Sequence, residues 1–240
     1  MAFSAEQRPI SKLLNDCILE IPRNQRHYVW KKDNWQDLLS DINFIVKNKD
    51  DKRHFIGSIV LKREESINGL DRYTIIDGQQ RTITIMLFLS AIMKLFQDKE
   101  MEKDFKGTIP YLISKDRKNE AYCILHSEEH LFIKDFVFKV TNYDENRNIN
   151  ELIKLSSIDR KKEDNIAKAI LFFYDELKEM SNKEIEPSAY LIAMRDALID
   201  TNCVEIIADT EEDSYTIFEI LNARGQALAD HELLKNYIMR

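Results

Sequence analysis

The sequence contains little of what builds sharp turns and covalent cross-links. Its 240 residues include only five glycines, four prolines and three cysteines. A low glycine and proline content beside long Leu, Ile, Lys and Glu stretches is typical of a mainly helical protein. The three cysteines are odd in number, far apart and without the spacing of metal ligands, so they indicate reduced thiols: Cys17, Cys123 and Cys203.

The chain also lacks a secretion signal, a long apolar run and an excess of positive charge. Its first twenty residues are interrupted by Glu6, Arg8, Lys12 and Asp16, and no apolar run approaches the roughly 20 residues that span a bilayer. The net charge of −7 disfavours nucleic-acid binding through overall charge alone. We therefore expect a cytoplasmic protein without a membrane partner, whose DNA contacts are local or come from another domain.

Residues 73–87 form the most informative segment. A β-branched run ends at Asp77 and Gly78, and an apolar helical run follows. A strand that enters a helix directly leaves the first helical N–H groups pointing forward, at the positive end of the helix dipole. Gly78 permits close backbone approach, Arg81 can bind a phosphate with its two-pronged guanidinium, and Asp77 can hold a metal or orient water. The turn therefore predicts an anion site; the alternative is that Asp77 only caps the helix and Arg81 is solvated.

Residues 22–32 form a second polar segment, with four Lys or Arg residues, no acid and two interleaved aromatics. Arginine supplies charge and aromatic rings supply stacking faces for bases. This pattern predicts local DNA contacts by Arg23, Arg26, Tyr28, Trp30 and Lys31. The alternative is that the two aromatics anchor the loop to the core and the cations are solvated.

Hydrophobic periodicity predicts a strand–helix pattern along the chain. Residues 54–61 and 72–76 are expected to form a hairpin, and Gly57 in its first strand indicates a bulge or a close backbone approach. A long central helix is expected at 79–97. Three segments are distinguished: a nucleotide-binding core at 1–97, a helical insertion or subdomain at 98–200, and a strand with helices that return to the core at 201–240. Further helices are predicted at 4–15, at about 34–46, from 165, at 189–198, from 210 and at 231–240, and further strands at 17–21 and 203–207.

Four motifs occur in a fixed order along the chain. They are Ile21-Pro22…Gln25-Arg26…Tyr28…Trp30, His54-Phe55-Ile56-Gly57-Ser58, Asp77-Gly78-Gln79-Gln80-Arg81, and Leu221-Asn222…Arg224-Gly225. In this order they resemble the N-terminal domain of the GmrSD-type restriction enzymes, which are type IV, modification-dependent defence proteins. The phosphorothioation-linked Ssp effector shares that domain. The resemblance spans nearly the whole chain, from Ile21 to Asn236.

The resemblance implies an α+β, mainly helical fold: a small ParB/sulfiredoxin-like mixed sheet with a long central helix and helical elaborations. It implies a domain that binds and hydrolyses a nucleoside triphosphate with Mg²⁺ and regulates DNA restriction. Cleavage would belong to a C-terminal HNH-type nuclease domain or a separate nuclease subunit; we expect that domain to be absent from this chain, which has no His-rich nuclease motif. Modified DNA and a second copy of the chain are further expected partners.

The predicted site follows from the turn and from the family motifs together. Asp77, Gln80 and Arg81 are the catalytic candidates, with Asp77 also the metal ligand. The chain has no Gly-x-x-x-x-Gly-Lys-Ser/Thr loop, so it is not an ordinary P-loop NTPase. Nucleotide binding is assigned to Gln25, Arg26, Gly57, Gly78, Gln79, Thr82, Asn222 and Arg224.

Two other functions stay open at this point. The domain can be a module that senses modified DNA through residues 23–32 without nucleotide turnover. It can also be a ParB-like, metal-dependent DNA nickase that uses Asp77, although the chain shows no cluster of carboxylates. A purely structural scaffold would leave Arg26, Arg81 and Arg224 without a common purpose.

Overall fold

The computed structural model describes residues 3–23, 25, 27–48, 55–127, 131–145, 147–156 and 164–223. A six-stranded sheet runs in the order β1-β8-β3-β4-β2-β7, and β5 and β6 form a separate hairpin. The large sheet is mixed: β1–β8 and β3–β4 are antiparallel, while β3–β8, β2–β4 and β2–β7 are parallel. The strands are β1 (Phe3–Pro9), β2 (Cys17–Ile21), β3 (Phe55–Ile67), β4 (Leu70–Asp77), β5 (Ile113–Lys115), β6 (Ala121–Cys123), β7 (Leu125–Ser127) and β8 (Asn202–Ala208).

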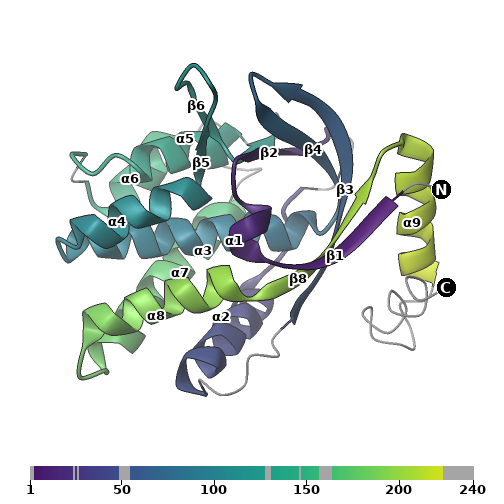
Figure 1. The fold of residues 1–240 in the computed structure, drawn as a ribbon. Coiled ribbons are helices and arrows are strands. Elements are labelled where there is room, and N and C mark those ends of the chain that lie inside the picture. The colour runs from purple at the N-terminus through teal and green to yellow at the C-terminus, as the bar shows by residue number, and fades with distance from the viewer. Residues whose placement is uncertain are drawn as a thin grey trace.

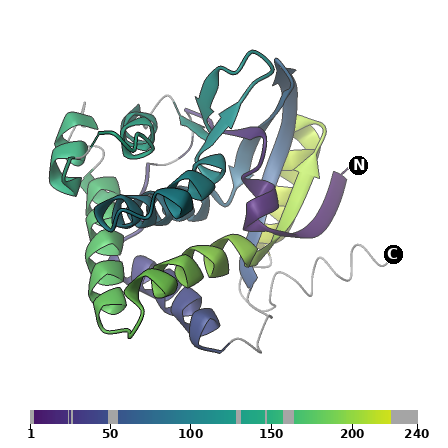
Figure 2. The same cartoon turned by 60° about the vertical axis from the view of Figure 1, so that its left-hand side comes forward.

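Helices cover both faces of the sheet unequally. Figure 1 and Figure 2 show the long helices on one side of the strands and α9 by itself on the other. The helices are α1 (Ile10–Leu13), α2 (Lys32–Lys47), α3 (Gln79–Asp98), α4 (Glu102–Thr108), the 3₁₀ turn η1 (Ile109–Tyr111), α5 (Leu131–Val140), α6 (Ile149–Ser156), α7 (Asp164–Asn182), α8 (Pro187–Asp200) and α9 (Glu211–Ala223). Of these described helices, none is long and apolar enough to cross a membrane.

Helix α3 is the centre of the main core. Nearly every residue from Gln79 to Gln97 is buried, and the helix packs against α4, α5, α7 and α8. This confirms the predicted central helix at 79–97 and the mainly helical α+β fold with a mixed sheet. A helix that is apolar nearly all round has to be surrounded by other elements, because no side of it can face water without exposing apolar surface.

The opposite face of the sheet has a much smaller core. Because side chains alternate along a strand, Ile59 and Leu61 of β3 enter the main core, whereas Val60 points to α9. Val60 forms a separate buried cluster with Ile206 and Ala208 of β8 and Ile217 of α9. Among the described side chains of α9, those of residues 211–218, Ile217 is the one that joins this cluster.

The first predicted helix, at residues 4–15, is wrong. Residues Phe3–Pro9 form β1, and only Ile10–Leu13 form a single helical turn. β1 pairs antiparallel with β8 along its full length, from Phe3 opposite Ala208 to Pro9 opposite Asn202. Backbone pairing with the edge of the sheet outweighs the weak helical period of this segment, as tertiary context commonly does.

The predicted hairpin is confirmed, with longer strands and a tighter turn than expected. β3 continues to Ile67 and β4 starts at Leu70, so the turn is at Asn68 and Gly69. The predicted strands at 17–21 and 203–207 are confirmed as β2 and β8. The three-residue strands β5, β6 and β7 were not predicted, because such short runs show no clear alternation. The predicted helix at 231–240 and the motif residue His54 lie outside the described residues.

The 98–200 segment shares its core with the rest of the chain. Its strand β7 pairs with β2 in the main sheet, and its helix α7 packs along α3. Phe88 of α3 and Phe173 of α7 lie in one buried cluster, with ring centroids 5.0 Å apart. The division of the chain into segments 1–97, 98–200 and 201–240 stays a prediction.

Candidate functional site

The strand order brings two sequence motifs to one edge of the sheet. β2 and β4 are parallel neighbours, with Cys17 opposite Asp71 and Glu20 opposite Thr74. Their carboxyl ends therefore lie at the same edge, where ligands commonly bind in such sheets. The loop of residues 22–30 follows β2, and the Asp77–Arg81 turn follows β4, so the two motifs meet although they are about fifty residues apart.

Gly78 makes the transition from β4 to α3. It is the N-cap of α3 with φ 91° and ψ 6°, a left-handed conformation, and an added Cβ would lie 3.0 Å from Ile59 Cγ1 and 3.2 Å from the Ser58 carbonyl oxygen. Both conformation and space therefore require glycine. The N–H and the hydroxyl of buried Thr82 donate to the Gly78 carbonyl oxygen over 2.9 and 3.1 Å. Asp77 therefore does not cap α3, and the first turn of α3 contains no acidic residue.

The Arg81 guanidinium lies directly on the Gly57 backbone. An added Cβ at Gly57 would be 2.5 Å from Nη2 and 2.6 Å from Cζ of Arg81, and Nη1 donates to the Ser58 carbonyl oxygen over 2.6 Å. Gly57 has φ 101° at a break in the β3–β8 register. The sequence indicated a bulge or a close approach at Gly57; the structure shows both, and the approaching group is Arg81.

Two glutamines attach the 22–30 loop to the sheet and to α3. Gln80 Oε1 accepts the N–H groups of Val29 and Trp30 over 2.8 and 3.3 Å, and its Nε2 donates to the His27 carbonyl oxygen over 3.1 Å. Gln25 Nε2 donates to the carbonyl oxygens of Ile75 and Ile76 over 2.6 and 3.2 Å. Both ends of the Gln80 amide are thus used to hold the loop in place.

The two loop aromatics have different positions. Tyr28 is only 4% exposed, and its hydroxyl lies 2.8 Å from Thr84 Oγ1 and accepts the Trp35 Nε1 proton over 2.8 Å. Burial raises the pKa of Tyr28 to about 12. Tyr28 therefore anchors the loop to the core and presents no ring face to a DNA base. Trp30 is half-buried and faces a cleft.

That cleft has a volume of about 570 Å³ and brings together the predicted turn residues 77–81 with Gln25 and Trp30. Its lining comes from the 22–30 loop, the end of β4, the turn with the first residues of α3, and α9. The volume is within the range of small-ligand sites. The lining residues are Pro22, Gln25, Trp30, Ile76, Asp77, Gly78, Gln79, Gln80, Arg81, Tyr215 and Phe218.

Sequence reasoning missed Tyr215 and Phe218. The predicted helix after Thr210 is confirmed, and the Thr210 hydroxyl accepts the Asp213 N–H over 3.1 Å. In the sequence, both aromatics belong to the apolar pattern of that helix. Nothing in the local sequence says that α9 crosses the outer face of the sheet and reaches the turn after β4, because this depends on the strand order.

Of the other predicted residues, those whose side chains the structure describes do not line the cleft. Gly57 and Thr82 lie behind the wall, where they support Arg81 and Gly78. Arg23 and Lys31 are exposed, and Lys31 is the N-cap of α2. Arg26 and Arg224 lie outside the described residues, as does the side chain of Asn222, so the meeting of three arginines stays a prediction.

Asp77 is suited to hold a cation only together with a ligand. It is half-buried in the cleft wall, and within the described part of the chain its carboxylate makes no hydrogen bond or ion pair. The described residues also contain no group of three or more His, Cys, Asp or Glu that could hold a metal. Because Mg²⁺ is often bound by one carboxylate plus substrate phosphates, Asp77 fits a Mg²⁺ ion that arrives with phosphates.

Comparison with known families gives one match of almost full length. The model described as the GmrSD restriction endonuclease, N-terminal domain, matches residues 10–239. A comparison with curated proteins gave no match. The matched range includes every element of the cleft, from the 22–30 loop to α9.

Proposed function

Because this chain belongs to the family of GmrSD restriction endonuclease N-terminal domains, we propose that its cleft binds and hydrolyses a nucleoside triphosphate. Membership in the family implies that the domain works together with a nuclease region. The nucleotide reaction would regulate that nuclease, which we propose to be of the HNH type and to act on modified DNA.

One observation supports the proposal above all others. Asp77, the N-terminus of α3 and Arg81 form one continuous wall of a cleft whose volume suits a nucleotide. The positive end of a helix dipole and a guanidinium both favour phosphate, and a carboxylate beside them suits a metal bound to phosphate. The three features together indicate a phosphate ester with a divalent cation rather than an isolated anion.

The proposed roles follow from the contacts. The backbone at Gly78 and Gln79 would bind the phosphates, and Arg81 would neutralise the charge that develops on the transferred phosphoryl group. A guanidinium has five N–H donors, so Arg81 can bond Ser58 and a phosphate at once, and the 2.6 Å bond to Ser58 fixes its direction.

Hydrolysis needs an attacking water and neutralised charge. Water attacks the terminal phosphorus, the bond from that phosphorus to the bridging oxygen breaks, and the diphosphate leaves with the bridging oxygen. Asp77 would hold Mg²⁺, which neutralises phosphate charge when bound, or would orient the water. Gln80 is better placed to fix the Trp30 loop than to contact water, because both ends of its amide bond the loop backbone.

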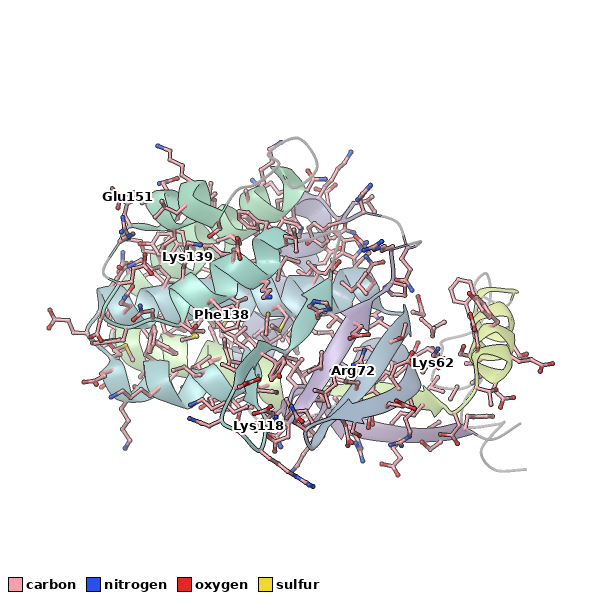
Figure 3. All side chains as sticks on the ribbon, turned by 90° about the horizontal axis from the view of Figure 1, so that it is seen from above. Lys62, Arg72, Lys118, Phe138, Lys139 and Glu151 are labelled. Carbon is pink, nitrogen blue, oxygen red and sulfur yellow. The ribbon has the colours of Figure 1, made fainter. Side chains whose placement is uncertain are left out.

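Phosphate release tests the proposal. The chain would be incubated with GTP, ATP, CTP and UTP in Mg²⁺, with and without DNA, and wild type compared with Arg81→Ala. Loss of Arg81 is expected to remove about 2–4 kcal/mol of transition-state stabilisation. Arg72→Ala is the matched control: Arg72 donates to Glu20 over 2.7 Å on the β2–β4 surface, and Figure 3 shows it beside Lys62 on the strands.

Each result decides between functions. Wild-type turnover in Arg81→Ala would overturn the assignment of Arg81. Absence of turnover with measurable nucleotide binding would indicate a nucleotide-dependent sensor rather than a hydrolase. Absence of both would reject the nucleotide site.

A second candidate is a module that contacts modified DNA. It is supported by the exposed cations Arg23 and Lys31, which flank Trp30 in the sequence and lie outside the cleft lining. A combined Arg23→Ala and Lys31→Ala variant would then lose DNA affinity and show a weaker salt dependence, while nucleotide binding would stay unchanged.

A further inference from the structure

The cleft lining includes aromatic side chains that the phosphate chemistry does not use. Tyr215 and Phe218 line it from α9, three residues apart and thus on one side of the helix. Trp30 lines it from the 22–30 loop. The aromatic side chains therefore come from two segments far apart in the sequence, and they share a single cleft with Asp77, Gly78 and Arg81.

Packing of α9 does not explain the exposed Tyr215 ring. The helix rests on the sheet through Ile217, which is 6% exposed and belongs to the cluster with Val60, Ile206 and Ala208. Tyr215, in contrast, is 49% exposed. An exposed aromatic beside a half-buried one in a cleft is a typical arrangement for a flat ligand, because each ring offers a face for stacking.

The loop that carries Trp30 is held in place. The backbone N–H of Trp30 and that of its neighbour Val29 both bond Gln80 Oε1, and Tyr28 fixes the same loop to the core through Thr84 and Trp35. Trp30 is thus presented by a loop whose backbone is bonded to α3. A preformed ring reduces the entropy that is lost on binding.

We propose that Trp30, Tyr215 and Phe218 form the base-binding end of the nucleotide site. The base would stack against the aromatic rings, and the triphosphate would extend to the N-terminus of α3 and Arg81. This inference rests on the proposed function and specifies which part of the cleft binds which part of the nucleotide.

A free nucleotide suits this end better than a base of a DNA strand. The first turn of α9 contains Glu211, Glu212 and Asp213, just before Tyr215. These carboxylates would repel the phosphates that flank a base in a polynucleotide. A nucleoside triphosphate has its phosphates on one side of the base only, and that side can point to Arg81.

Two kinds of probe distinguish binding of the base from binding of the phosphates. The first kind is the β,γ-imido analogues of the four nucleoside triphosphates, and the second is inorganic tripolyphosphate. Calorimetry measures the affinity of the chain for each. Tyr215→Ala and Phe218→Ala are expected to weaken binding of the analogues by about tenfold or more and to leave tripolyphosphate binding unchanged. Arg81→Ala should weaken binding of both. Tyr215→Phe, which keeps the ring, should recover most of the affinity that Tyr215→Ala loses.

Fluorescence gives a second readout. The chain has two tryptophans, and Trp35 is buried in the core at 5% exposure, so quenching by an analogue reports on Trp30. Quenching is expected with the analogues and not with tripolyphosphate. Phe44→Ala is the control for loss of an exposed aromatic, because Phe44 is 47% exposed on α2 and does not line the cleft.

Four results would overturn the inference, each for a different reason. Unchanged binding of the analogues in both α9 variants would reject the base end and leave the proposed function standing. Weaker tripolyphosphate binding in the same variants would show that α9 acts on the whole site. Loss of binding to a single-stranded oligonucleotide, with analogue binding kept, would assign the aromatics to DNA. Failure of wild type to bind either probe would reject the proposed function as well.

Discussion

Gly57 leaves the space that the Arg81 guanidinium occupies, which makes a residue without a side chain part of the site. Alanine there would strain a backbone with φ 101° and place a Cβ 2.5 Å from Arg81 Nη2. The guanidinium would have to leave the Ser58 carbonyl oxygen. We predict that Gly57→Ala lowers nucleotide turnover by at least about tenfold, since removal of one charge-stabilising group typically costs more than that.

Gly69 offers a matched control for this substitution. It also has a positive φ, of 92°, and an added Cβ would lie 2.4 Å from Nε of another guanidinium, that of Arg117. Both variants should lose a similar amount of stability, about 1–3 kcal/mol, in thermal unfolding. Only Gly57→Ala should lose phosphate release; equal turnover in the two variants would contradict the role given to Gly57.

Glu205 is a buried carboxylate that the proposed mechanism does not use. It is 5% exposed, and Arg8 Nη1 lies 2.9 Å from its Oε2. Burial raises the pKa of the Glu205 carboxyl, and half-exposed Arg8 offsets this only in part. A raised pKa means that the folded state binds the proton more tightly, so its contribution to stability is present below the ordinary value of 4.5 and is lost as pH rises above it.

Replacing Glu205 by glutamine should therefore remove part of this pH dependence. We predict that the free energy of unfolding of Glu205→Gln falls less steeply than that of wild type as pH rises from 4.5. Urea unfolding at a series of pH values measures this slope. A steeper fall in the variant would show that the Arg8 ion pair, and not burial, dominates at this position.

At the scale of elements, the segments with strong local patterns were predictable. The β4–turn–α3 unit has a β-branched run, a single glycine and a long apolar run, and each feature agrees with the others. The segment of β1 was not predictable, because its partner β8 is almost two hundred residues away and pairing decides its structure. Only part of the cleft could be predicted, for the same reason. The turn residues are identified by the local sequence, whereas the presence of Tyr215 and Phe218 in the cleft depends on where α9 packs.

Helix α9 should open more easily than the rest of the fold. Among its described side chains, those of residues 211–218, the buried apolar one is Ile217, which lies in the small cluster apart from the main core. Ile217→Ala removes part of a buried side chain, at a cost of about 2–5 kcal/mol. Because a weakly attached element can unfold locally, we predict faster hydrogen exchange of α9 amides, weaker nucleotide binding and a nearly unchanged urea midpoint for the whole chain.

Ile170→Ala in the main core is the contrasting variant. It should lower the urea midpoint, and a similar drop in Ile217→Ala would show that α9 is not a separate opening unit.

At the scale of the whole molecule, the main core connects segments that the sequence divides. Leu19 of β2, Phe88 of α3, Phe136 of α5 and Phe173 of α7 belong to one buried cluster. The contacts between α3 and α7 also include a polar link, since the Tyr174 hydroxyl donates to Asp98 over 2.7 Å and Lys94 donates to the same carboxylate. Residues 98–162 are highly charged, and their composition alone does not predict this shared core. The core depends on a few apolar residues of this segment that lie on the helix faces turned toward α3.

A substitution in α7 should therefore unfold the sheet together with the helices. Phe173 is fully buried, and its ring centroid lies 5.0 Å from that of Phe88. We predict that Phe173→Ala lowers the free energy of unfolding by about 3–5 kcal/mol. Hydrogen exchange in increasing urea should then show β3, β4 and α7 amides opening in one transition. Glu179→Ala, at an exposed ion pair with Lys183 on the same helix, should leave the stability nearly unchanged, because solvent screens exposed ion pairs. If β3 and β4 stayed protected after α7 had opened, residues 98–200 would form a subdomain of their own, and the cleft could then fold without it.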